Sequence, residues 1–304
     1  MIASLTKSTM KQYSACFKKY WNFCLSKGQD PFVYKLQTYL EFLSEHLNQG
    51  NSFSVINSYR SALNLIFGPL ETGDQKIITR FLKGVANVHP PRPKYSFTWN
   101  PDPVLEHLES LYPLENLTIE LLVKKLVTLM ALTSASRVQT LSVIKLENIN
   151  IKPDKIEIKI PERIKTTAPG RYQPLLIFPF FNNNPKLCVA STIVAYINQT
   201  QLCRKDVKNL ILTLRKPIHA ASSQTISRWI KKTLYDAGID TSVYSAHSIR
   251  HASTSAAFRA GVNIEQIRNT AGWTPTSKTF FKFYNRPLKE PNDNFARAIM
   301  NLGK

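Results

Sequence analysis

Four stretches of this sequence carry arginine, lysine, histidine and aromatic side chains at spacings that suit chemistry on a phosphate group. One arginine follows a small-residue turn in ALTSASRVQTL, and one lysine lies close to the Pro-Gly pair of RIKTTAPG. In AHSIRH a histidine and an arginine are three residues apart, which places both on one face of a helix. In AGWTPTSKTFFKFYNRP a tyrosine follows a tryptophan by 11 positions. The candidate site residues are Arg137, Lys165, His247, Arg250, Trp273 and Tyr284.

The motifs that usually hold metals or nucleotides do not occur in this sequence. There is no glycine-rich loop ending in Gly-Lys-Ser or Gly-Lys-Thr, no HExxH pattern and no close set of carboxylates. The four cysteines show no CxxC pairing and no histidines at zinc spacing, which favours reduced, buried thiols. A protein that breaks phosphodiester bonds without a metal must take its positive charge and its nucleophile from side chains. We therefore expect no metal and no cofactor.

A large excess of positive charge runs through the chain. Of the 304 residues, 40 are Lys or Arg and 20 are Asp or Glu, which gives a net charge of +20. Both the first 90 residues and the remainder hold twice as many basic as acidic residues. A polyanion relieves the self-repulsion of such a surplus, which favours double-stranded DNA as the partner. On composition alone, RNA, acidic lipid or simple solubility are the alternatives.

The sequence predicts neither a secretion signal nor a membrane segment. Residues 1–10 are polar, and the apolar run at 121–132 is interrupted by Lys124 and Lys125. We therefore expect a soluble intracellular protein with no membrane partner.

The first part of the chain is predicted to be a helical module. Apolar residues recur at helical spacing over 8–27, 32–48, 52–67 and 74–87. The segment 89–103 holds five prolines and few apolar residues, which is typical of an extended linker. We expect a helical DNA-binding domain at 1–88, a linker at 89–102 and a second domain at 103–304.

Basic and aromatic residues of the first module are candidates for contacts with the DNA backbone. They are Lys18, Lys19, Tyr59 and Arg60. A solvated helix face explains these residues nearly as well as a DNA contact does.

The second part of the chain combines helices with a small sheet. The alternating run 155–160 and the apolar run 172–178 flank Pro169-Gly170, which predicts a β-hairpin. Helices are predicted near 103–112, 117–133, 187–203, 222–236, 246–260, 263–270 and 276–284. The expected fold class is mainly α, with a helical N-terminal domain and a mixed α/β domain that is mostly helical and holds a small antiparallel sheet.

The four stretches resemble the catalytic motifs of the tyrosine recombinase (phage integrase) family, in the order Arg, Lys, His-x-x-Arg, His or Trp, Tyr. The AGWT form is similar to that of Cre-like catalytic domains, and SRVQTL, HSIRHASTSAA and FKFYNRP look closest to eukaryotic Crypton and DIRS-like transposons. The resemblance covers nearly the whole chain, as a core-binding domain followed by a catalytic domain. It implies a site-specific recombinase or transposase that integrates or excises a mobile element. Such an enzyme would act in the nucleus of a eukaryotic host and otherwise in the cytoplasm, associated with the nucleoid.

The resemblance also implies a role for each candidate. Tyr284 would attack the scissile phosphorus and form a covalent 3′-phosphotyrosyl intermediate. Two arginines, Arg137 and Arg250, would bind the non-bridging oxygens in fork geometry. Lys165 would protonate the departing 5′-oxygen. His247 would act as base or proton shuttle. Where many relatives carry a second histidine, Trp273 would donate its indole N–H.

The same resemblance predicts a homo-oligomer, with a tetramer assembled on two DNA sites. The C-terminal tail helix carries an amphipathic pattern and would dock on a neighbouring protomer, or equally on its own domain. The residues on its apolar face are Phe295, Ile299, Met300 and Leu302.

Two features depart from the family pattern. Thr140 stands where relatives often carry an acidic residue, three positions after the first arginine, and the spacing from Trp273 to Tyr284 is a residue or two longer than expected. Lys159 and Arg163 flank the same hairpin as the predicted general acid, so a neighbouring lysine is an alternative for that role. A type IB topoisomerase-like enzyme and a domesticated, non-catalytic DNA-binding protein are the alternative functions.

Overall fold

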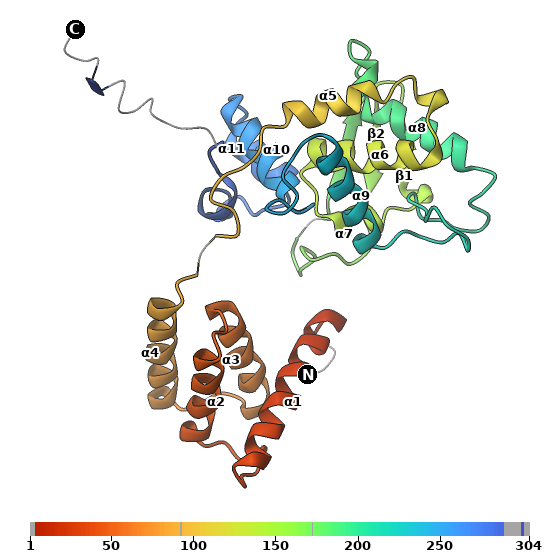
Figure 1. Ribbon diagram of the computed structural model, residues 1–304. Helices are drawn as coiled ribbons and strands as arrows, with labels where there is room; N and C mark the ends of the chain where they lie inside the picture. Colours follow the sequence, from red (N-terminus) through yellow and green to blue (C-terminus); the bar gives the residue numbers. More distant parts are fainter. Residues whose placement is uncertain (1–3, 92, 172, 289–298, 301–304) are drawn as a thin grey trace. The chain divides into compact units, whose positions relative to one another are not determined.

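Amphipathic helices form most of both halves of this protein. The computed structural model describes residues 4–91, 93–171, 173–288 and 299–300, and it divides the chain into two units, 1–94 and 95–304 (Figure 1). The expected class, mainly helical with a small antiparallel sheet, is confirmed. The division falls inside the segment expected to be a linker, because Tyr95 and Trp99 are buried in the core of the second unit.

Four α-helices make up most of the first unit over its described residues. They are α1 (Lys7–Ser26), α2 (Leu36–Asn48), α3 (Phe53–Phe67) and α4 (Thr72–Val88). Their buried faces meet in an aromatic core, where the rings of Tyr20 and Phe42 lie edge to face with centroids 5.1 Å apart. Each fully buried side chain of this size contributes roughly 1.5–3 kcal/mol, so the aromatic spacing read from the sequence accounts for the packing of the module.

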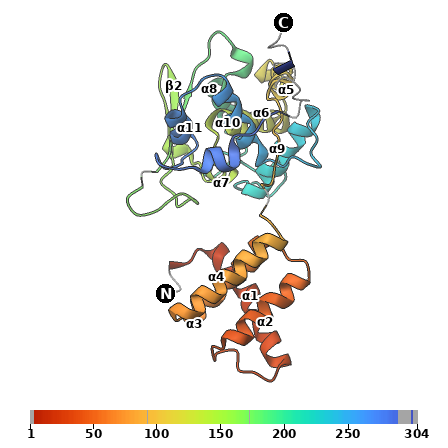
Figure 2. The ribbon, with the colours of Figure 1, turned by 90° about the vertical axis from the view of Figure 1, so that its left-hand side faces the viewer.

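The second unit is built around α6 (Ile119–Ser134), which is buried on nearly every side. It packs against α8 (Val189–Thr200), α9 (Ser223–Asp236) and α10 (Ser248–Arg259), and two views show these helices around it (Figure 1, Figure 2). The other α-helices of this unit are α5 (Asp102–Ser110), α7 (Val138–Ser142) and α11 (Ile264–Thr270). Short 3-10 turns lie at Leu114–Asn116, Leu146–Asn148 and Pro185–Leu187. Because α6 presents apolar residues all round, it is a central helix rather than a surface one.

A three-stranded antiparallel sheet lies in the same unit. Its order is β1 (Ile149–Ile151), β2 (Lys155–Lys159) and β3 (Leu175–Pro179). Ile156 pairs with Phe178 in the register, and both face the core. The predicted hairpin corresponds to β2 and β3, whereas β1 was not predicted. Its three residues are too few for a period of two to be seen in the sequence.

The segment that carries Tyr284 is shorter than the helix predicted at 276–284. It forms a single π-helical turn, η5 (Phe280–Tyr284), which is closed by the amide of Asn285 donating to the carbonyl of Phe280. Single π-turns are uncommon and are frequent at functional sites. The turn therefore singles out Tyr284 on backbone geometry as well as on sequence.

Candidate active site

Tyr284 lies at the last position of η5 and is mostly buried, with 9% of its surface exposed. His247, which precedes the first residue of α10, places its Nε2 atom 3.2 Å from the phenolic oxygen of Tyr284. An imidazole at that distance can take or return the phenolic proton. The structure therefore brings together the predicted nucleophile and the predicted proton shuttle, although they are 37 positions apart in the sequence.

Arg250 is one turn along α10 and is almost fully buried, at 2% exposure. Its two terminal nitrogens donate to the carbonyls of Ala135 and Ala271, which follow the last residues of α6 and α11. A guanidinium can bond two carbonyls at once because its donors form a rigid fork. One side chain thus joins α6, α10 and α11, and its cation is held in a fixed orientation.

The carbonyl that holds Arg250 comes from a strained backbone position. Ala135 has a φ of 46°, in the left-handed region that residues with a Cβ seldom adopt. Such strain costs on the order of 1 kcal/mol and persists where the surroundings determine the conformation. Here the buried guanidinium of Arg250 supplies that constraint.

Burial and a neighbouring cation both act on Arg250. Desolvation, and after it the positive charge of Arg137, together lower its pKa to about 10, and Tyr284 opposes this shift. Arg250 is therefore still a cation at neutral pH, and Arg137 is close enough to interact with it electrostatically. Arg137 itself is half-buried at the start of α7.

Trp273 is positioned by the end of α11. The amide of Trp273 donates to the carbonyl of Arg268 and that of Gly272 to Asn269, and Gly272 has a φ of 65°. This pairing is a Schellman motif, which needs a left-handed residue and therefore favours glycine. The indole ring is thereby placed 4.8 Å from the Cζ atom of Arg250 and 4.8 Å from the ring of Tyr284.

Two buried N–H groups beside Tyr284 have no hydrogen-bond acceptor within the described part of the chain. They are Nε of Arg250 and Nε1 of Trp273. A buried donor without an acceptor costs about 1–3 kcal/mol, so native proteins rarely leave such groups in place. Together with the Arg250 cation, these donors form a site suited to an anionic oxygen.

Lys165 lies apart from this buried group of side chains. It is exposed in the connection between β2 and β3, as is Arg163, and Lys159 is exposed at the last position of β2. The later part of this loop and the residues around Trp273 line a hollow of about 460 Å³. Thr166, which follows the predicted general acid in sequence, and Trp273 itself are among the residues that line it. The hairpin loop therefore faces the Trp273 side of the site, and Lys165 has no fixed partner among the described residues.

The position that departs from the family pattern is internal. Thr140 is buried in α7, and its amide donates to the carbonyl of Arg137. This backbone bond closes the first turn after Arg137. The threonine side chain therefore fills space near that arginine and supplies no charge to it.

Several residues outside the predicted candidate set support Tyr284, among them His251, for which the sequence favours a core or capping role or a phosphate contact. The imidazole of His251 stacks on the tyrosine ring with centroids 4.2 Å apart and an interplanar angle of 19°. Ser255 donates to the carbonyl of Tyr284, and Arg286 donates from its Nε atom to the carbonyl of Tyr95. The spacing of His251 and Ser255 along α10, one turn apart on the face of His247, is the sequence signal that could have indicated them.

The predicted DNA contacts of the first unit have different environments. Lys18 and Lys19 are exposed on α1, and the ammonium of Lys19 donates to the hydroxyl of Tyr59 at 2.7 Å. The ring of Tyr59 is buried in the aromatic core, so only its polar end is near the surface. Arg60 is half-buried, and its Nε atom donates to Asn57 on the same helix.

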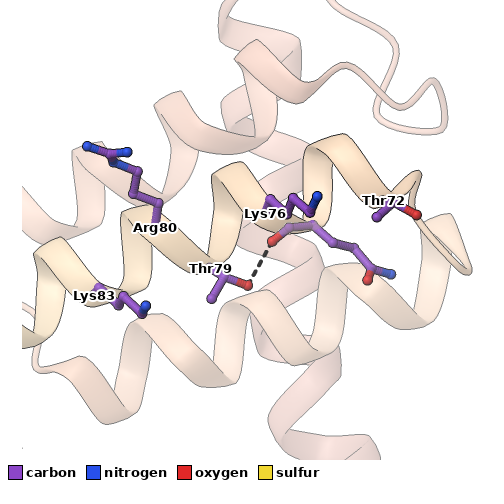
Figure 3. Close-up of a pocket in the computed structure, with 6 residues that line it drawn as sticks. Thr72, Lys76, Thr79, Arg80 and Lys83 are labelled. Atoms are coloured by element: carbon purple, nitrogen blue, oxygen red, sulfur yellow. Dashed lines mark hydrogen bonds between the residues drawn. The ribbon is translucent and has the colours of Figure 1, made fainter.

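A basic face on α4 was not predicted. Lys76, Arg80 and Lys83 recur at intervals of four and three residues, so they project from the same side of the helix (Figure 3). With Thr72, Gln75 and Thr79 they line a hollow of about 510 Å³, and the hydroxyl of Thr79 donates to the carbonyl of Gln75. Within the described residues, none of these three cations pairs with a carboxylate. This face, called here the α4 basic face, is free to meet phosphate.

Two classes of site or segment are not found among the described residues. No cluster of three or more His, Cys, Asp or Glu side chains could hold a metal ion there. In the same part of the chain, no helix combines the length and the apolar character that crossing a bilayer would require.

Solved structures with this fold include several recombinases bound to DNA. XerH site-specific recombinase in a post-cleavage complex with a palindromic difH substrate matches with a TM-score of 0.64 and 13% identity, over 97% of this chain and 80% of that one. The Tn1549 transposon integrase in complex with transposon right end DNA matches with a TM-score of 0.60 and 14% identity, over 99% and 95%. A lambda integrase dimer bound to a COC′ core site matches with a TM-score of 0.54 and 14% identity, over 92% and 89%. At such identities the likeness establishes the fold.

The family of this chain is assigned from its sequence. Among curated protein sequences, none matches this chain at a significant level. The model of the phage integrase family, however, matches residues 107–290, which is more than half of the chain and includes every predicted catalytic position. The expected resemblance is confirmed: this chain belongs to the phage integrase family of tyrosine recombinases.

Proposed function

We propose that this protein is a site-specific DNA recombinase or transposase that cuts and rejoins DNA through Tyr284, to integrate or excise a mobile element. The observation that carries the proposal is the hydrogen bond between Tyr284 and His247 beside a buried Arg250 whose Nε–H has no acceptor among the described residues. A nucleophile, a proton acceptor and anion-binding donors are thus gathered at one place. Membership of the phage integrase family supports the same reaction.

The proposed first step forms one bond and breaks one bond at phosphorus. The phenolic oxygen of Tyr284 attacks the scissile phosphate, and its proton passes to His247. The bond to the 5′-oxygen breaks, and Lys165 supplies the proton that this oxygen takes up. The product is a 3′-phosphotyrosyl ester and a free 5′-hydroxyl.

Rejoining is the same step in reverse, with a 5′-hydroxyl from another strand as the attacking group. A phenol has a pKa near 10, which makes it a good leaving group, so the energy of the original bond is kept in the ester. No nucleotide cofactor or metal is needed for this exchange.

The positive charges of the site stabilise the transition state. Arg137, Arg250 and the indole N–H of Trp273 donate to the non-bridging oxygens, where negative charge accumulates. Donors that are already oriented do not need to reorganise during the reaction, and the loss of one such donor typically costs 10²- to 10³-fold in rate. The carbonyls of Ala135 and Ala271 give Arg250 this fixed orientation.

In the first unit, the α4 basic face together with Lys18, Lys19 and Arg60 would contact the DNA backbone. Tyr59 would contribute through its hydroxyl, which orients Lys19. The net charge of +20 supports a polyanion as partner for both units.

We also propose a homotetramer on two DNA sites, with exchange of the C-terminal tail between protomers. A related fold, lambda integrase, has been solved as a tetramer bound to a Holliday junction. Of the apolar tail residues, Phe295 and Leu302 lie outside the described residues, whereas Ile299 and Met300 are exposed. In a eukaryotic host the reaction would take place in the nucleus. The resemblance of the motifs SRVQTL, HSIRHASTSAA and FKFYNRP to those of Crypton and DIRS-like elements supports a eukaryotic origin.

The decisive experiment traps the covalent intermediate. Duplexes with a randomised centre and a nick on one strand are incubated with the protein; after cleavage the short nicked fragment is lost, and rejoining cannot occur. Wild type should give a protein–DNA adduct that survives denaturation, and Tyr284→Phe should give none. Sequencing the DNA in the adduct identifies the target. An adduct that persists with Tyr284→Phe contradicts the proposal.

Two alternatives predict other outcomes in the same assay series. A type IB topoisomerase-like enzyme would relax supercoiled plasmid that lacks the recovered target and would exchange no strands between duplexes. A domesticated DNA-binding protein would shift the mobility of DNA without forming an adduct. A recombinase should exchange strands between two duplexes that both carry the target.

A further inference from the structure

The ring of Tyr284 stacks on a side chain that does not take part in the reaction steps above. His251 lies one residue beyond Arg250 on α10 and is 6% exposed. Its imidazole is nearly parallel to the phenol ring, at 19°, with centroids 4.2 Å apart. Nearly parallel rings at this separation attract each other, and the stack restricts rotation of the ring about χ1 and χ2.

His251 is also in contact with the segment that begins the second unit. The ring of Tyr95 meets the imidazole edge to face, with centroids 5.0 Å apart and planes at 81°. The hydroxyl of Tyr95 is within 2.7 Å of the Ser245 hydroxyl. These contacts fix Tyr95, and Tyr95 in turn prevents the imidazole from moving away from Tyr284.

The backbone around Tyr284 is fastened to the same segment. The guanidinium of Arg286 donates to the carbonyls of Tyr95 and Lys282, at 2.9 Å each. Leu288, two residues after Arg286, forms a β-bridge with Thr98, and the amide of Thr98 donates to the carbonyl of Pro287. Residues 95–98 therefore hold the chain after Tyr284, while His251 holds the tyrosine ring.

From this arrangement we infer that His251 is a positioning residue for the nucleophile: its flat face, backed by Tyr95, keeps the phenolic oxygen of Tyr284 in line for attack on the phosphate. The inference rests on the proposed function for its reaction. The planar face carries out the role, and the ring nitrogens are not required for it. His247, whose Nε2 atom contacts the phenolic oxygen, handles the proton.

A matched pair of variants separates the flat face from the volume of the side chain. His251→Phe keeps a planar ring, whereas His251→Leu has a similar apolar volume and no planar face. With the target DNA recovered from the wild-type adduct, single-turnover cleavage is measured over a range of protein concentrations. His251→Phe should cleave within about threefold of wild type. For His251→Leu the maximal rate should fall on the order of 10- to 100-fold, because misplacement of a reacting group by about 1 Å has an effect of this size.

The concentration that gives half-maximal cleavage should be unchanged in both variants, because His251 is buried beneath Tyr284 and does not reach DNA. A residue with a merely structural role would lower stability and binding together, and the phenylalanine variant would not rescue the rate selectively. Equal rates for wild type and His251→Leu overturn the inference. A loss of cleavage by a folded His251→Phe variant also overturns the inference, and this test remains available even if His251→Leu does not fold.

A second measurement is independent of activity. Stacking on His251 should shift the ring proton resonances of Tyr284 upfield; these resonances are identified by their absence from Tyr284→Phe. The shift should be retained in His251→Phe and lost in His251→Leu. If wild type forms no adduct at all, the proposed function fails, whereas these resonances still test the stack. An unshifted Tyr284 ring in wild type overturns the positioning role.

Discussion

Replacement of Arg250 by lysine should affect stability and catalysis through separate contacts. The two terminal nitrogens of Arg250 donate to the carbonyls of Ala135 and Ala271, and the side chain is 2% exposed. A single ammonium group has no fork and reaches one of these carbonyls at most. One buried carbonyl is then left without a donor, at about 1–3 kcal/mol, so the free energy of unfolding should fall by that amount.

The effect of Arg250→Lys on cleavage should be larger than its effect on stability. The variant loses an oriented donor to the transition state, which typically costs 10²- to 10³-fold in rate, or about 3–4 kcal/mol. The positive charge is kept, so affinity for DNA should change little. The assay is single-turnover formation of the covalent adduct on the recovered target, alongside a filter-binding titration and denaturant unfolding.

Arg137→Lys is the matched control for this prediction. Arg137 is half-buried, and its side chain forms no hydrogen bond within the described part of the chain. We therefore expect a similar loss of cleavage and a change in unfolding free energy within about 0.5 kcal/mol. Full stability in Arg250→Lys would refute the anchoring role of the two carbonyls. Parallel losses of binding and cleavage would refute the transition-state role and make both arginines positioning residues.

Three further predictions address other groups. Lys165→Ala should slow cleavage by about 10²- to 10⁴-fold, and DNA with a bridging 5′-sulfur should restore the rate, because a thiolate leaves without a proton; if Lys159→Ala behaves this way instead, Lys159 is the general acid. Changing Lys76, Arg80 and Lys83 to Gln should make the slope of log binding constant against log salt concentration shallower by about 0.9 for each residue changed. The control is Lys232→Gln, which should leave this slope unchanged because the ammonium of Lys232 is already paired with Asp236 at 2.6 Å. Burial lowers the pKa of Lys125 from 10.5 to about 8. Between these two pH values the unfolded chain binds more protons at this lysine than the folded chain does, so the free energy of unfolding should rise with pH. From pH 7 to 9, urea unfolding should show wild type gaining about 1 kcal/mol relative to Lys125→Met, and equal pH profiles would contradict the shift.

Sequence periodicity was sufficient for most of the helices. Their apolar residues repeat every three or four positions, and the burial of α1, α2 and α9 follows that repeat. The candidate site could also be predicted in outline, because each of its members lies in a short local motif. Four of the six, His247, Arg250, Trp273 and Tyr284, are linked by contacts, in which His247 and Trp273 each reach Tyr284.

What the sequence could not supply depends on contacts between distant segments. The stack of His251 on Tyr284 joins α10 to η5, and the support from Tyr95 comes from a segment 156 positions earlier than His251. A proline-rich composition indicated a linker there, but Tyr95 and Trp99 find partners in Ser245 and Ser248 of the second unit. The anchoring carbonyls of Ala135 and Ala271 belong to backbone and leave no trace in residue type. The α4 basic face was missed because three cations on an amphipathic helix look like an ordinary solvated face.

The two groups of site residues differ in how far they are fixed before DNA arrives. Arg250, Trp273, His247 and Tyr284 are held by buried contacts, whereas Lys165 is exposed on a loop without a fixed partner among the described residues. The phosphate donors gain from rigidity, because their task is the same during cleavage and rejoining. The proposed general acid would have a different task in each direction: it would give a proton to the leaving 5′-oxygen and take one back from the incoming hydroxyl. A lysine that is placed by the DNA itself would be in position only when a strand end is present. In the proposed reaction, this arrangement would limit attack by water on the phosphotyrosyl ester while the strands exchange.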